Sequence, residues 1–295
     1  GSNTEVIDLK GNTLMPGFID IHTHPILSAK TAETIDVSGF NHKNEEEVME
    51  SLKKGIEEKG RGEWAIAYGW DPSILRNLEA PTLKELDQMA PENPLFIIAQ
   101  TIHSGFANSL ALEAAGITKD TPNPEGGYFD KDENGELTGL IVEVGAMEKI
   151  FDATVKYPRA AYLYLLTKQM ETYSKAGYTT IVAPGLGPII PKHIQSLQEV
   201  AEHPNAPVRV FTYPLFDRLE KTDFKPSQGN QKFKVLGPKF WIDGSPYAGG
   251  MAMNEPYLDN EFTRNRLGIK SGEKGRLNYE DERLSFLVNK FHKEG

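Results

Sequence analysis

The chain has 295 residues, of which 39% are hydrophobic and 25% are charged, as in an ordinary folded globular protein. Its formal net charge of -10, with no concentrated block of lysine and arginine, disfavours nucleic acid or an anionic membrane as the main partner and favours a small-molecule substrate. Cysteine is absent, which excludes disulfides, thiolate metal sites and cysteine nucleophiles. Neither a membrane-spanning apolar run nor a secretion signal is recognisable, so we expect a cytoplasmic location.

The first part of the chain predicts two short strands and a helix. Residues 6–9 alternate apolar and polar side chains before a Lys-Gly-Asn turn, which is typical of a half-buried strand. Residues 17–24 predict a second strand that ends at Pro25. Apolar residues at four-residue spacing predict an amphipathic helix over 45–59.

The middle of the chain reads as an insertion of about residues 60–150. Residues 64–70 and 94–100 predict strands with turn-rich sequence around them, and residues 119–139 predict a loop or hairpin. After the insertion, helices and strands alternate, which indicates a parallel sheet, either doubly wound or a barrel. The predicted elements are helix 159–175, strand 178–183, helix 190–202, strand 208–213, strand 239–243 and helix 281–293.

His22 and His24 are the strongest candidates for chemistry. On a strand, a His-x-His pair places both imidazoles on one face, about 6–7 Å apart along the chain, close enough to bind one metal ion or to line a two-metal centre. For an arbitrary pair, one surface and one core histidine would be the better interpretation. Here an apolar strand, an acid two residues before the first histidine and a proline after the second make the pattern far more specific.

Residues 14–25 resemble the Pro-Gly-x-x-Asp-x-His-x-His signature of the amidohydrolase superfamily. Further blocks resemble its branch called amidohydrolase family 3, which includes N-substituted formamide deformylase-like proteins. These blocks, which follow the family's order, are residues 69–71, 102–112, 135–139, 177–180 and 239–245.

The resemblance implies an α/β fold: a TIM-like (β/α) barrel beside a small β-sandwich, with the active site at the C-terminal ends of the strands. Residues 3–13 would be a remnant of the sandwich and residues 14–295 part of the barrel. His22 and His24 would then be metal ligands on the first strand. Lys239 would fall on the fourth strand, where many relatives have a lysine whose carbamate bridges two metals. A solvated lysine at a strand edge is the alternative.

Three further residues have both a functional and a structural interpretation. Asp20 either orients a histidine ligand or satisfies nearby backbone amides. His103 either lines the substrate pocket or begins a helix with local capping groups. Asp243 either shapes the pocket or forms a turn. The remaining histidines, on predicted loops or exposed helices, are His42, His193, His203 and His292.

The resemblance also implies a divalent cofactor, with zinc expected, in one or two ions. The family's later ligands, two histidines and a closing aspartate that acts as base, have no counterpart in this chain. We therefore expect the intact protein to hydrolyse a non-peptide C–N bond with a metal-activated water, and the chain alone to be inactive and prone to self-association through an open sheet edge. The alternatives are a non-catalytic scaffold and a doubly wound enzyme, but neither a phosphate-binding loop nor a Gly-x-Ser-x-Gly motif is present.

Overall fold

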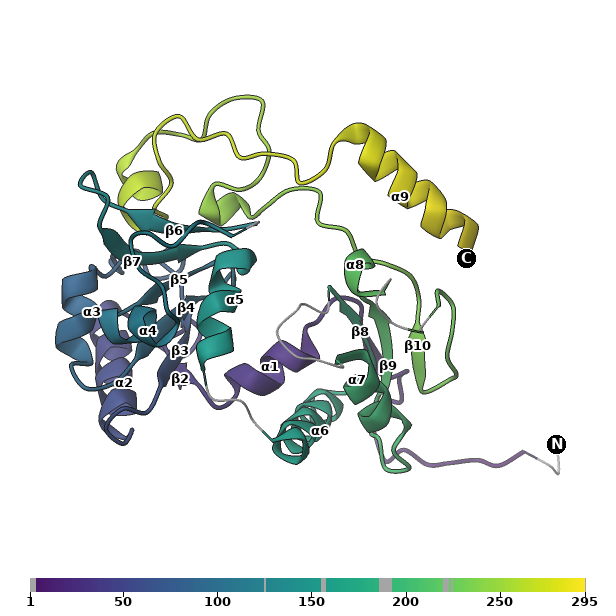
Figure 1. The fold of residues 1–295 in the computed structure, drawn as a ribbon. Helices are drawn as coiled ribbons and strands as arrows, with labels where there is room; N and C mark the ends of the chain where they lie inside the picture. The colour runs from purple at the N-terminus through teal and green to yellow at the C-terminus, as the bar shows by residue number, and fades with distance from the viewer. Residues whose placement is uncertain are drawn as a thin grey trace.

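The computed structural model describes residues 4–124, 126–154, 158–185, 193–219, 223 and 225–294. The strands of this part of the chain form two sheets, one of four strands and one of six (Figure 1). No helix within these ranges has the length and apolarity that a membrane crossing requires.

The four-stranded sheet is wholly parallel. Its strands, in spatial order, are β1 (Phe18–Asp20), β8 (Tyr178–Pro184), β9 (Arg209–Tyr213) and β10 (Phe233–Val235). Two helices connect successive strands or lead into them: α6 (Arg159–Lys175) precedes β8, and α7 (His193–Glu202) lies between β8 and β9. Because parallel neighbours need such crossovers, the helices pack on the sheet and bury it.

β-branched and aromatic residues at the sheet centre form the core of this layer. Ile181, Val210 and Phe233 are fully buried and lie at equivalent positions of three adjacent strands. α6 ends at Lys175, and Gly177 follows with a φ of 90°, a left-handed conformation that glycine adopts without a Cβ clash. This turn places β8 directly against β1.

The six-stranded sheet is mixed and carries its own helices. The spatial order of its strands is β2 (Ile35–Asp36), β3 (Ala65–Trp70), β4 (Leu95–Ala99), β5 (Ser104–Ala107), β7 (Leu137–Val142) and β6 (Tyr128–Lys131). Its helices are α2 (Glu45–Glu57), α3 (Leu83–Met89), α4 (Ser109–Ala114) and α5 (Val144–Ala153). Two buried clusters, one on each side of β4, give this layer a core of its own.

The helix α1 (Pro25–Thr31) follows β1 and lies between the two sheets in Figure 1. Ile26 and Ala29 of α1 belong to the core of the parallel sheet, where they join Leu166 and Met170 of α6. The later chain forms a short helix α8 (Phe216–Leu219), single turns at Pro246–Ala248 and Phe262–Arg266, and the terminal helix α9 (Asp281–Glu294).

Three predicted strands differ from the structure. Residues 6–9 are exposed and form no strand, because no neighbouring strand of the described chain pairs with them. The strand predicted to reach His24 ends at Asp20, since Pro25 begins α1 instead. The strand predicted at 239–243 is replaced by the earlier β10, and Lys239 forms only an isolated parallel bridge with Leu215.

The other predicted elements match within a few residues, apart from residues 190–192 of the helix predicted at 190–202, which lie outside the described ranges. The segment at 119–139 is a hairpin, with β6 and β7 antiparallel around a turn at residues 132–135. Helices α1, α3, α4, α5 and α8 and strands β2, β5 and β10 were not predicted. All eight are ten residues or shorter, so they carry little periodicity.

Candidate metal centre

His22 and His24 lie just beyond the C-terminal end of β1. The chain there stays beside β8, because the backbone N–H of Thr23 donates to the carbonyl of Val182 at 3.0 Å. Both histidines are exposed, and their imidazoles lie close together, with ring centroids 5.4 Å apart and an interplanar angle of 75°. The two candidate nitrogen ligands therefore lie close together just beyond the C-terminal end of β1.

Asp20 fixes the backbone of this turn. Its carboxylate accepts a hydrogen bond from the backbone N–H of His22 at 3.1 Å. Of the two interpretations of Asp20, the described contacts match the backbone one, since neither imidazole is among its hydrogen-bond partners in the described chain.

The environment of His24 favours its neutral form. Burial lowers the pKa of His24 below its usual 6.5, and electrostatic interactions with His22 and Lys239 lower it further. The backbone carbonyl of Pro184, at the end of β8, accepts from the ring and opposes this decrease. A neutral imidazole keeps a lone pair for a metal ion.

Lys239 also lies at the C-terminal end of the parallel sheet. Its backbone N–H donates to the carbonyl of Pro214 at 2.7 Å, and its carbonyl accepts from Phe216 at 3.1 Å, so it is tied to the chain just after β9. Its charge acts on His24. Because all four strands are parallel, their C-terminal ends meet on one side, and the structure brings His22, His24 and Lys239 together there.

These three residues fit an incomplete metal site. Two imidazoles and one lysine supply fewer donors than the four of a structural zinc site and are comparable with the three of a catalytic one. Within the described ranges, no group of three or more histidine, aspartate or glutamate side chains is arranged to hold an ion. His22 and His24 are therefore the two candidate metal ligands. Lys239 is the candidate for a third.

His103 lies immediately before β5 of the six-stranded sheet. Its partner is Glu143, a residue that the sequence did not indicate as functional. Its Nδ1 is 2.7 Å from Oε2 of Glu143, at the end of β7. Both side chains are partly exposed, at 31% and 21%. The alternative interpretation of His103 expected Asn108 as a local capping group, and the side chain of Asn108 does cap α4, but His103 itself precedes β5 and does not begin that helix.

Glu143 has a backbone conformation that only glycine adopts readily. Its φ is 66° and its ψ 158°, in a region where other residues are strained. Hydrogen bonds hold it there: its backbone N–H donates to the carbonyl of His103, and its Oε1 accepts from the backbone N–H of Ser245 at 3.3 Å. Strained residues of this kind concentrate at functional sites. The sequence feature nearest to Glu143 among those singled out above is the block at residues 135–139, which ends four residues upstream.

Asp243 forms a turn in the loop that follows Lys239. Its carboxylate accepts from the backbone N–H of Ala252 at 3.1 Å, and its carbonyl accepts from the side chain of Asn278. Since Ser245 of the same loop meets Glu143, this loop connects the parallel sheet with the six-stranded sheet.

The other described histidine side chains belong to other segments of the fold. The ring of His42 is 3.0 Å from the carbonyl of Ser38, and His203 and His292 are exposed. The side chain of His193 lies outside the described part of the chain.

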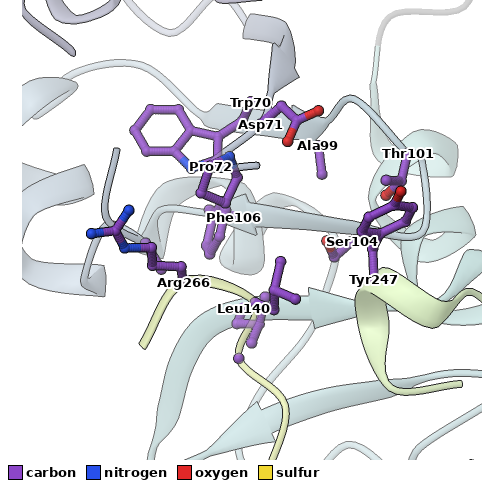
Figure 2. A pocket seen from close by; sticks show the side chains of 13 residues that line it. Trp70, Asp71, Pro72, Ala99, Thr101, Ser104, Phe106, Leu140, Tyr247 and Arg266 are labelled. Atoms are coloured by element: carbon purple, nitrogen blue, oxygen red, sulfur yellow. The ribbon is translucent and has the colours of Figure 1, made fainter. Parts of the chain in front are cut away.

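A small cavity lies at the edge of the six-stranded sheet (Figure 2). Trp70 and Arg266 border one end and Thr101, Ser104 and Tyr247 the other. Its volume of about 40 Å³ is far below the ~300 Å³ at which small-molecule pockets begin. The buried indole N–H of Trp70 has no hydrogen-bond partner in the part of the chain that is described. This cavity is too small to be a substrate pocket.

Comparison with known proteins places these residues in a family. The amidohydrolase family model matches residues 5–295. The chain is 38% identical over 144 residues to the N-substituted formamide deformylase of Arthrobacter pascens, covering 49% of this chain and 27% of that protein. It is 26% identical over 306 residues to the putative amidohydrolase YtcJ of Bacillus subtilis, covering 99% of this chain and 53% of that protein.

Solved structures of metal-dependent hydrolases also resemble this chain. An uncharacterized metal-dependent hydrolase from Pyrococcus horikoshii superposes with a TM-score of 0.64 at 27% identity, and one from Pyrococcus furiosus with 0.60 at 25%. Each match covers the whole of this chain and 54% and 56% of the respective relative, so the chain spans about half the length of the proteins it resembles. With its mixed α/β fold and its family match over nearly every residue, the chain belongs to the amidohydrolase family.

Proposed function

We propose that this chain carries the first metal ligands of a metal-dependent hydrolase that cleaves a non-peptide C–N bond, of the amide type, in a small molecule. The parallel sheet would be part of a TIM-like barrel. The observation that supports the proposal is the convergence of His22, His24 and Lys239 at the C-terminal edge of that sheet. Barrel enzymes carry their chemistry at this edge.

His22 and His24 would hold a divalent ion, with zinc expected, through their imidazole nitrogens. When bound, such an ion lowers the pKa of a water molecule and polarises a carbonyl. Lys239 would add a ligand or, as a carbamate, bridge two ions. Asp20 would hold the turn that carries His22, through its hydrogen bond to the backbone there.

The substrate would be an amide whose leaving group is an amine. An N-substituted formamide is the first compound class to test, because the name of the Arthrobacter pascens relative specifies that bond. His103 would line the substrate site, with its ring fixed by Glu143 through Nδ1, so that Nε2 remains available for a proton. Asp243 would shape the same wall through its turn.

Zinc titration of the chain by calorimetry tests the metal site directly. The His22→Ala/His24→Ala double variant should bind zinc at least about tenfold more weakly, since both proposed imidazole ligands are removed. The matched control is His203→Ala/His292→Ala, because these two histidines are exposed and lie away from the sheet edge. Its zinc affinity should equal that of the unaltered chain.

Two outcomes would overturn the proposed ligands. Equal zinc affinity in the His22→Ala/His24→Ala variant would show that the ion binds elsewhere. Absence of zinc binding by the unaltered, folded chain, and of binding by cobalt or manganese, would favour a scaffold role. Because the chain alone is expected to be inactive, release of an amine from N-substituted formamides by a longer protein that contains this chain, measured with and without a chelator, then tests the bond type.

A further inference from the structure

A second cavity lies between α1 and the six-stranded sheet. It has a volume of about 420 Å³, within the ~300–1,000 Å³ typical of small-molecule pockets. Its lining comes from the end of α1 and the segment after it, from β3 and β4 with the loop before β3, and from the end of α5. It shares no lining residue with the candidate metal centre.

Apolar and aromatic side chains form much of its wall. Trp64 and Ile66 come from the β3 side, Ile98 from the buried strand β4, Phe151 from α5 and Leu27 from α1. Such a wall offers an apolar or aromatic molecule a surface that is already arranged in the fold. The ligand needs few internal rotations to fit, which limits the entropy lost on binding.

Lys30 is a partly buried cation within this lining. It lies in the last turn of α1, and no hydrogen bond or ion pair engages its ammonium group among the residues that the structure describes. Burial lowers the pKa of Lys30 to about 8, and the carboxylate of Asp152 only partly opposes this decrease. A desolvated cation that has no close partner among the described residues gains most from an anionic ligand.

The other charged groups around the cavity lie nearer to solvent. Glu33, Glu63 and Asp152 are exposed, and Glu63 accepts a hydrogen bond from the backbone N–H of Gly60. Lys59, just after α2, is half-buried and is the second cation of the lining. Lys30 is the charged group of the lining whose pKa burial lowers, and it is therefore the group that a ligand would neutralise.

We propose that this cavity binds a small organic carboxylate with an aromatic or aliphatic body, whose carboxylate pairs with Lys30 and whose body packs against Trp64 and Phe151. The site is distinct from the metal centre, because none of His22, His24 and Lys239 belongs to its lining. Binding would require neither zinc nor the hydrolytic reaction.

Calorimetric titration with 3-phenylpropionate at pH 7 tests the proposal, and 3-phenylpropan-1-ol serves as the uncharged ligand of similar shape. The carboxylate should bind about tenfold or more tightly than the alcohol, since only the carboxylate forms a charge-assisted hydrogen bond. Lys30→Met should abolish this preference. Lys30→Arg, which keeps the cation, and Lys59→Met, which alters the other lysine of the lining, should largely retain it.

The same titration separates this site from the metal centre. The His22→Ala/His24→Ala variant should bind 3-phenylpropionate as the unaltered chain does, even if its zinc binding is lost. Quenching of Trp64 fluorescence that disappears in Trp64→Leu would locate the ligand. Failure of the carboxylate to bind, equal binding of the alcohol, or unaltered carboxylate preference in a folded Lys30→Met variant would each overturn the proposal.

Discussion

Nδ1 of His103 and Oε2 of Glu143 are 2.7 Å apart, although 40 positions separate the two residues in the chain. The pair joins the start of β5 to the end of β7, and the second carboxylate oxygen reaches the backbone of Ser245 in the loop after Lys239. One carboxylate thus links two strands of the six-stranded sheet to a loop of the other sheet.

Replacing Glu143 should loosen this link. Glu143→Ala should lower the free energy of unfolding by about 1–3 kcal/mol, because His103 and Ser245 lose an acceptor, and should expose the loop at 243–253 to protease. Glu143→Gly should lose less than Glu143→Ala, because glycine tolerates the φ of 66°. Urea unfolding and timed proteolysis measure both effects.

Glu113→Ala, at an exposed position of α4, is the control and should leave both measurements nearly unchanged. A Glu143→Ala variant as stable as Glu143→Gly would contradict the strain at this position. An unchanged cleavage rate in the loop would contradict its link to Glu143.

Gly17 is required by the close approach of β1 to β8. A Cβ at this position would lie 2.1 Å from Cγ2 of Thr179. Gly17→Ala should therefore destabilise the chain by about 1–3 kcal/mol and weaken zinc binding, because β1 must move and His22 follows it.

A double variant tests the cause. Thr179→Ala removes the clashing atoms, so Gly17→Ala/Thr179→Ala should recover much of the stability that Gly17→Ala loses. If the two losses simply add, the steric explanation fails. Gly237→Ala, whose Cβ would be 3.7 Å from Tyr213, is the control for an ordinary contact.

The side chain of Asn108 is fully buried and forms hydrogen bonds with four backbone groups. Its Oδ1 accepts from Leu95 and Ala111, and its Nδ2 donates to the carbonyls of Ala90 and Asn93. Asn108→Asp should lower the free energy of unfolding by about 3 kcal/mol or more, since a buried carboxylate cannot donate to either carbonyl.

Thermal unfolding measured by circular dichroism checks this expectation. Asn134→Ala is the control, because Asn134 lies in the exposed hairpin turn, and it should change stability by less than about 0.5 kcal/mol. An Asn108→Asp variant that unfolds like the unaltered chain would show that the four hydrogen bonds contribute little.

Lys30 should make stability depend on pH in the alkaline range. Its pKa is about 8 in the folded chain against 10.5 for a free lysine, so the unfolded chain binds more protons between these values. The free energy of unfolding therefore rises as the pH increases from about 8 to 10.5. Lys30→Met should lack this rise and, at pH 7, be more stable by about 1 kcal/mol.

Urea unfolding at pH 7, 9 and 10.5 measures the difference between the two chains. Lys59→Met is the control and should keep the dependence of the unaltered chain. A stability difference between Lys30→Met and the unaltered chain that stays constant over this pH range would contradict the lowered pKa.

The sequence by itself identified the family and the two histidines, because the signature at residues 14–25 concentrates its information in a few adjacent positions. It also predicted most of the strands and helices that have clear periodicity, such as α2, β4 and β8. It extended β1 to His24, since an alternating pattern continues past the point where Pro25 begins a helix.

Tertiary structure alone decided which residues meet. Lys239 approaches His24 because parallel strands bring distant segments to one edge, and Glu143 meets His103 because an antiparallel sheet folds β7 beside β5. Lys30 acquires a lowered pKa through its burial at the cavity that α1 forms with the six-stranded sheet. Contacts and desolvation between residues far apart in the chain depend on packing, which local sequence patterns do not encode.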